Sequence, residues 1–167
     1  NMISVFTENR KISDYYKVKP GMTTSNNNQF LRLWHEANWE NIGFNCKSID
    51  DSVESEKKWF PYNKGGNFRK WYGNNEYLID WENDGLNIKQ YKLKQRESDP
   101  KFNIGIAALN DIFKEGLTYS IFGFENFGIR YKEHGYLFDV SGASIFPPKD
   151  EMFYLLAFLA SNVSFSF

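Results

Sequence analysis

Basic and aromatic side chains are interleaved between residues 57 and 72, and this combination suits a nucleic-acid contact. The segment contains five basic residues and six aromatics without a carboxylate. Lys64, Arg69 and Lys70 can neutralise phosphates through their charges. The segment therefore predicts cations that position a duplex through its backbone.

Amides and glycines in the same segment extend this prediction. Asn63 and Asn67 each offer a donor and an acceptor, which is the pair that an adenine edge requires. Gly65 and Gly66 lack a Cβ, so a phosphate could approach their backbone closely. We therefore expect both backbone and base contacts from this region.

The alternative is that the aromatic residues form the core and the charges only solvate the outside. We expect Trp59, Trp71 and Trp81 to be mostly buried, with the three cations pointing outward on one face, whereas an exposed Trp71 would favour a stacking surface. The residue types alone leave both interpretations open.

Other kinds of site are poorly supported. The chain has no glycine-rich nucleotide loop and no Gly-x-Ser-x-Gly elbow. Cys46 is the single cysteine and His35 and His134 lie far apart, so we expect no metal site and no internal disulfide. Glu82 and Asp84 are paired carboxylates, but they flank Asn83 and precede Gly85, which is more typical of a turn than of catalysis.

Composition limits the class of protein. The 167 residues fit one domain, 1–167, and a net charge of -1 excludes a globally basic nucleic-acid binder. Any anion site must then come from local segregation of charge. The longest apolar run, 152–160, is too short to cross a bilayer, and the N-terminus shows no export signal. We expect a protein without a membrane partner, in the reducing cytoplasm.

Strand and helix patterns predict an α+β fold with a mixed, largely antiparallel sheet and a few short helices. A polar loop is expected at 21–29, and a solvated loop or a short turn of helix at 50–58. Strands are expected at 12–19, 30–36, 77–81, 117–122, 127–132 and 136–140. Helices are expected at 86–96, at 110–114 with Asn110 or Asp111 as its cap, and from Asp150, as N-cap, to Ala160.

Long motifs resemble one family. The run from Trp59 to Asn74, followed by Trp-Glu-Asn-Asp-Gly at 81–85, resembles the region downstream of the catalytic core in the BREX phage-defence adenine-specific DNA methyltransferases of the PglX type. It is also similar to related type II restriction-modification enzymes. Residues 23–36, 114–120 and 138–147 resemble the same target-recognition region, so the resemblance covers 12–163.

The resemblance implies a target-recognition fragment. The catalytic Asn-Pro-Pro-Tyr motif and the S-adenosylmethionine motif of the family lie in a separate preceding domain, and this chain contains neither. We therefore expect no catalytic residue, metal or cofactor here, with S-adenosylmethionine bound by the parent protein. The implied partners are double-stranded DNA and the methyltransferase domain of the same polypeptide.

The candidate DNA-binding residues fall in three segments. The first is the cationic segment, with Lys64, Asn67, Arg69 and Lys70. The second is residues 23–28 of the polar loop. In that loop and in the third segment, 119–130, side chains would contact base edges: Thr23, Thr24, Ser25, Asn26, Asn27, Asn28, Tyr119, Ser120, Asn126 and Arg130.

Two other functions remain as alternatives. A protein-interaction module would dock other subunits of the defence system through its aromatic surface. Its binding would respond little to salt, whereas counterion release makes DNA affinity fall steeply. A hydrolase using Glu82 and Asp84 lacks a partner group nearby.

Overall fold

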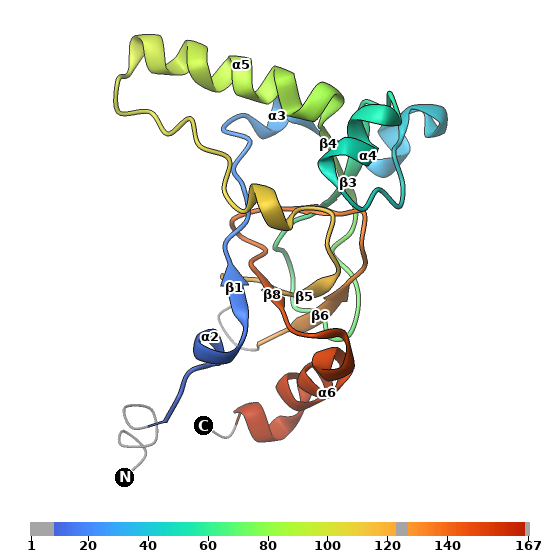
Figure 1. The fold of residues 1–167 in the computed structure, drawn as a ribbon, viewed down its shortest axis with the longest axis vertical. Helices are drawn as coiled ribbons and strands as arrows, with labels where there is room; N and C mark the ends of the chain where they lie inside the picture. The colour runs from blue at the N-terminus through green and yellow to red at the C-terminus, as the bar shows by residue number, and fades with distance from the viewer. Residues whose placement is uncertain (1–8, 123–126, 166–167) are drawn as a thin grey trace.

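Two four-stranded sheets organise the computed structural model, which describes residues 9–122 and 127–165 (Figure 1). All pairs in the first sheet are antiparallel, and its order is β1 (Lys17–Lys19), β8 (Ser144–Phe146), β5 (Gly116–Tyr119) and β6 (Ile129–Lys132). The second sheet has the order β2 (Leu31–Leu33), β4 (Tyr77–Asp80), β3 (Trp59–Asn63) and β7 (Leu137–Phe138), with β3 and β7 parallel.

Helices lie mainly at the two ends of the molecule. In Figure 1, α6 lies at the lower end beside the first sheet, and α5 extends across the upper end beyond the second sheet. The α-helices are α2 (Ile12–Tyr15), α3 (Asn27–Phe30), α4 (Ile49–Glu54), α5 (Glu82–Ser98) and α6 (Lys149–Ala160). Short 3-10 helices are η1 (Trp34–Glu36), η2 (Trp39–Asn41), η3 (Leu109–Asp111) and η4 (Asn162–Phe165).

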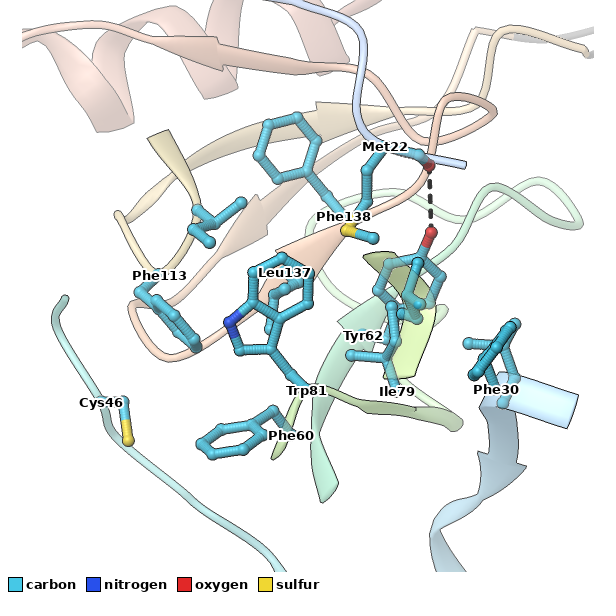
Figure 2. Close-up of a cluster of buried hydrophobic side chains, with 13 residues drawn as sticks. Met22, Phe30, Cys46, Phe60, Tyr62, Ile79, Trp81, Phe113, Leu137 and Phe138 are labelled. Atoms are coloured by element: carbon cyan, nitrogen blue, oxygen red, sulfur yellow. Dashed lines mark hydrogen bonds between the residues drawn. The ribbon is translucent and has the colours of Figure 1, made fainter. Parts of the chain in front are cut away.

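Each sheet has its own apolar core. Phe60, Tyr62 and Ile79 of the second sheet pack with Trp81 and Phe138 in the cluster of Figure 2, where all five are fully buried. The first sheet instead packs against the apolar face of α6, where Met152, Leu155, Leu156 and Leu159 meet Leu117, Ile129 and Ile145. Phe146 of β8 also packs on the second-sheet cluster, with its ring centroid 5.8 Å from that of Phe138, so an apolar contact links the two sheets.

The α+β class is confirmed, with the strands divided between two sheets. Six strands fall in the expected regions, but β3 and β8 were not expected, and α3 begins within the expected polar loop. Residues 12–15 form α2 before β1, because the Asp14 carboxylate accepts the Lys11 backbone N–H and closes a helical turn. The strand expected at 30–36 ends at Leu33 and continues as η1.

The helix predicted at 110–114 is wrong. Asp111 closes the short η3 and is buried, and its carboxylate pairs with Lys17 at 2.6 Å and with Lys114 at 3.4 Å. The Asp111 carboxylate, which we expected to cap a helix, is instead paired with Lys17 of β1. Asp150 lies in the first turn of α6, and Pro148 occupies the N-cap position instead.

A buried polar junction joins the two sheets at Asn63, the last residue of β3. Its Oδ1 accepts a hydrogen bond from Thr118 Oγ1 of β5 at 3.0 Å, and its Nδ2 donates to Asn75 Oδ1 at 2.8 Å. Next to it, the Tyr62 hydroxyl donates to Asp139 Oδ2 at 2.8 Å. Burial and the Asp139 charge raise the pKa of Tyr62 well above its ordinary value, so the phenol stays protonated as the donor.

Lys132 is a buried cation on the first sheet. Its ammonium lies 5.3 Å from the Phe138 ring centroid and 5.5 Å from that of Phe146, and it donates to the Lys114 carbonyl. Burial lowers the pKa of Lys132 to about 7, although the Asp111 and Glu115 charges oppose this shift.

We expect Thr118→Val to destabilise the protein by about 1–3 kcal/mol, because it leaves the buried Asn63 carbonyl oxygen without its donor while preserving side-chain shape. Urea unfolding measures this loss. Ser98→Ala, which removes a hydroxyl at an exposed position, is the control and should unfold like the parent. An unchanged midpoint for Thr118→Val would show that the junction contributes nothing to stability.

We expect the free energy of unfolding to rise with pH between pH 7 and 9 through Lys132. The unfolded lysine binds a proton in this range and the folded one releases it, so each pH unit adds at most about 1.4 kcal/mol. Lys132→Met should remove this slope, and Lys19→Met, exposed on β1, should keep it. If Lys132→Met retains the slope, the lysine stays charged between the two rings.

Candidate nucleic-acid interface

Three adjoining hollows lie beside the edge strand β2. The first, of about 370 Å³, shares Leu33 and Tyr77 with the second, of about 290 Å³. We call these two hollows together the edge groove. A third hollow, of about 350 Å³, adjoins the second through Arg69, Asn74 and Glu76. The polar lining of the edge groove includes Asn27, Asn28, Arg32, Lys64, Asn67 and Arg69.

The edge groove brings two of the three predicted segments together. Asn27 and Asn28 come from the polar loop and α3, whereas Lys64, Asn67 and Arg69 follow β3. Antiparallel pairing of β2 and β3 with the central β4 contributes to this meeting, because Leu33 at the end of β2 and Tyr62 near the end of β3 both pair with Tyr77. Neither segment alone would form a groove.

Cations outnumber carboxylates in the edge groove. Arg32, Lys64 and Arg69 line it with two acids, Glu36 and Glu76, so its local balance is positive although the chain carries -1 overall. The charge segregation expected from the sequence is therefore present here.

The three cations differ in how firmly they are held. The Arg32 guanidinium donates to the Asn28 and Leu31 carbonyls and lies 5.5 Å from the Trp59 ring centroid, so its position is fixed. Lys64 Nζ lies 5.5 Å from the Tyr77 ring centroid. Within the described residues, the charged groups of Lys64 and Arg69 have no hydrogen bond or ion pair, which leaves both open to an anion.

Hydrogen bonds organise the polar loop before α3. Asn26 caps this helix by accepting the Gln29 backbone N–H at 3.2 Å. Buried Thr24 donates to Asn27 Oδ1 at 2.6 Å, which orients the Asn27 side chain. Thr24 therefore supports the loop, whereas Asn27 and Asn28 are exposed on the edge groove. Thr23 and Ser25 are exposed but do not line it.

Gly65 and Gly66 serve an internal contact, which differs from the phosphate approach we expected. A Cβ on Gly65 would lie 2.1 Å from the Ser141 carbonyl oxygen. The Gly66 N–H donates to Ser120 Oγ at 3.1 Å, and that hydroxyl lies 3.1 Å from the Gly66 carbonyl. The glycines thus let the segment after β3 pack against the loop after β7.

The third predicted segment, 119–130, contacts the edge groove from the interior, because Ser120 is hydrogen bonded to Gly66 in the groove lining. Fully buried Arg130 donates to the Gly128 carbonyl at 3.3 Å and to Ser120 Oγ at 3.4 Å. A guanidinium in this position holds the protein together and is not available to a base edge. Tyr119 is half-buried against the Phe127 ring. Asn126 lies outside the described residues.

Three further expectations need correction. Asn63 is fully buried in the junction between the sheets, so its amide cannot read a base. Lys70 lies apart from the edge groove, because its ammonium donates to the Ala160 carbonyl at 2.8 Å, at the C-terminal end of α6. Trp81 is buried and Trp59 is half-buried, but the Trp71 side chain is 53% exposed.

The acidic pair at 82 and 84 belongs to a turn. Asn83, Asp84 and Gly85 all have positive φ, and a Cβ on Gly85 would lie 2.6 Å from the Trp81 ring. Asp84 pairs with Lys89 at 2.5 Å. The motif thus packs the start of α5 against a buried indole, and nothing in this geometry supports a hydrolase.

Among the described residues, no cluster of three or more His, Cys, Asp or Glu side chains could hold a metal ion. None of the described helices combines the length and apolar character needed to cross a bilayer.

Sequence reasoning missed several groove residues. Arg32, Tyr77 and Glu76 line the edge groove but were not assigned to a site. A signal existed for Arg32, which occupies the polar position between Leu31 and Leu33. No comparable signal marks Tyr77, since its position depends on the pairing of β4 with β2.

Comparisons with known proteins agree with the resemblance seen in the sequence. The chain is 38% identical over 164 residues to an adenine-specific methyltransferase PglX of Lacticaseibacillus casei (strain Zhang), a match that covers 94% of this chain. It is 36% identical over 117 residues, 70% of this chain, to an adenine-specific methyltransferase BrxX of Escherichia coli O9:H4 (strain HS). The matches span only 13% and 8% of those proteins. No protein-family model matches the chain.

We expect Lys70→Met to lower the melting temperature by a few degrees, because a cation at the C-terminal end of α6 contributes about 0.3–1 kcal/mol. Lys149→Met at the opposite end of the same helix is the matched control, and it should not lower the melting temperature. Equal melting temperatures for Lys70→Met and the parent would refute this capping role.

Proposed function

We propose that this chain, which is similar over most of its length to part of the PglX-type adenine-specific methyltransferases, binds double-stranded DNA and selects the adenine to be methylated. The observation that carries this proposal is the edge groove, where unpaired cations and exposed amides from two distant segments meet. Phosphate contacts fix the position of a protein on a duplex and base-edge contacts supply its sequence preference.

In this function Lys64 and Arg69 hold phosphates, and Arg32 adds a fixed positive charge between them and α3. Asn27, Asn28 and Asn67 offer amides to base edges, since an amide pairs bidentately with adenine. Arg130, Thr24 and Ser120 support these residues from the interior.

Methyl transfer itself falls to another part of the polypeptide. The glycine pair after β3 is packed against Ser141 and hydrogen bonded to Ser120, so this pair does not offer its backbone to a cofactor. A methyltransferase domain elsewhere in the parent polypeptide would bind the cofactor, draw the adenine out of the duplex and methylate it in the cytoplasm as part of phage defence.

A protein-interaction role is the second candidate, and one observation favours it. Trp39 and Phe44 lie with ring centroids 4.6 Å apart, and the Trp39 side chain is 67% exposed. Exposed aromatic pairs of this kind occur at protein interfaces. Such a contact would dock other subunits of the defence system and would be insensitive to salt.

We expect the 167-residue chain to bind duplex DNA with an affinity that falls as salt rises. Lys64→Ala and Arg69→Ala should each weaken binding to every duplex and reduce the slope of log affinity against log salt by about one, because each removes one phosphate contact. Fluorescence anisotropy at several salt concentrations measures both quantities.

Lys70→Met and Lys149→Ala are the matched controls, since both cations lie outside the edge groove. Both variants should keep the slope of the parent. A parent affinity that does not depend on salt, or a slope that changes in the controls and not in the groove variants, would contradict the proposed function.

A further inference from the structure

The third hollow has two exposed aromatic walls. Trp34 of η1 is 56% exposed and Tyr72, after β3, is 53% exposed, and both line this space of about 350 Å³. Large aromatic side chains with this much surface in water cost free energy unless a ligand covers them. The volume lies near the lower limit of about 300 Å³ for small-ligand pockets.

Polar groups of both kinds line the same hollow. Arg69 offers donors, and the Glu76 carboxylate offers acceptors. Asn75 Oδ1 already accepts a hydrogen bond from Asn63 Nδ2 at 2.8 Å, which leaves the Asn75 amide N–H groups as donors. A nucleobase edge requires this mixture of donors and acceptors.

Backbone hydrogen bonds hold both walls in place. The Trp34 N–H donates to the Glu76 carbonyl at 3.0 Å, and the Leu33 N–H donates to Glu36 Oε2 at 2.7 Å. The residue before Tyr72, Trp71, bonds through its N–H and carbonyl to β6. The walls are therefore formed before any ligand arrives.

Gly73 sets the position of Arg69 in this hollow. Its φ is 126°, and a Cβ there would lie 2.6 Å from Arg69 Cδ. The stem of Arg69 thus crosses the backbone at a point that only glycine leaves open. The guanidinium is shared by the edge groove and the third hollow, so the two sites adjoin.

We propose that the hollow bounded by Trp34, Tyr72, Arg69 and Glu76 binds an unpaired nucleobase that has left the duplex. In a paired duplex the base faces are stacked inside, where exposed aromatic rings cannot reach them. A base that swings out presents both a face for stacking and a free edge for hydrogen bonds. This inference rests on the proposed function, because the edge groove would hold the duplex beside the hollow.

Two duplexes of one sequence test this inference, one fully paired and one with a single bulged 2-aminopurine. The parent chain should bind the bulged duplex about tenfold more tightly, since stacking on an aromatic side chain has this order of effect. The 2-aminopurine fluorescence should fall when the base stacks. Anisotropy and fluorescence titrations report the two effects separately.

Variants assign the effect to the hollow. Trp34→Ala and Tyr72→Ala should abolish the preference for the bulged duplex and leave binding to the paired duplex within about twofold, because neither residue lines the edge groove. Trp34→Phe and Tyr72→Phe keep an aromatic face and should retain most of the preference. Trp39→Ala removes an equally exposed indole outside the three hollows and is the matched control.

The outcomes separate the two proposals. Equal affinity for both duplexes, with steep salt dependence, overturns the inference and leaves the proposed function standing. Loss of the preference in Trp39→Ala but not in Trp34→Ala or Tyr72→Ala overturns the assignment to this hollow. Failure to bind either duplex overturns both proposals. Circular dichroism of each variant confirms that the fold is retained.

Discussion

The arrangement of the whole chain depends on the buried hydrogen bond between Asn63 and Thr118. Each sheet has its own apolar cluster, and the contact of Phe146 with Phe138 between the two sheets is apolar and therefore not directional. Both ends of the Asn63 side-chain amide are hydrogen bonded in the interior, so Thr118 of the first sheet must lie in one direction from it. Beside it, the bond from Tyr62 to Asp139, which follows β7, fixes β7 against β3 within the second sheet. Hydrogen bonds are directional, and a buried polar group without its partner is costly, so this junction selects one arrangement of the sheets.

The candidate site inherits its geometry from this junction. Asn63 is the last residue of β3, and the segment carrying Lys64 and Arg69 begins directly after it. Close packing of Gly65 against Ser141 and the bonds between Gly66 and Ser120 then hold that segment in place. The backbone that carries Lys64 and Arg69 is therefore held in place, whereas the charged groups of both side chains have no hydrogen bond or ion pair among the described residues. Such a combination suits an anion contact, because little freedom is lost on binding.

The proposed affinity for DNA depends on the local charge and shape of the edge groove and not on the overall composition of the chain. A net charge of -1 gives no sign of affinity for DNA, yet cations outnumber carboxylates along the edge groove. The similarity to adenine-specific methyltransferases covers most of this chain and only a small part of those proteins. A recognition role for the groove and a stacking role for the neighbouring hollow would divide the binding of a distorted duplex between two adjoining surfaces.

The sequence by itself determined the α+β class, most strands, the long helices α5 and α6, and the resemblance to the methyltransferases, because periodicity, turn residues and long motifs are local signals. It also identified Lys64, Arg69, Asn27 and Asn28, whose positions meet in the edge groove. Only the tertiary structure decided which polar residues are interior. Arg130, Lys70 and Asn63 look like surface groups in the sequence. Lys70 and Asn63 instead make long-range hydrogen bonds, and buried Arg130 forms a β-bridge with Trp71. Burial of a polar side chain depends on strand pairing across the whole chain, and no local pattern encodes that pairing.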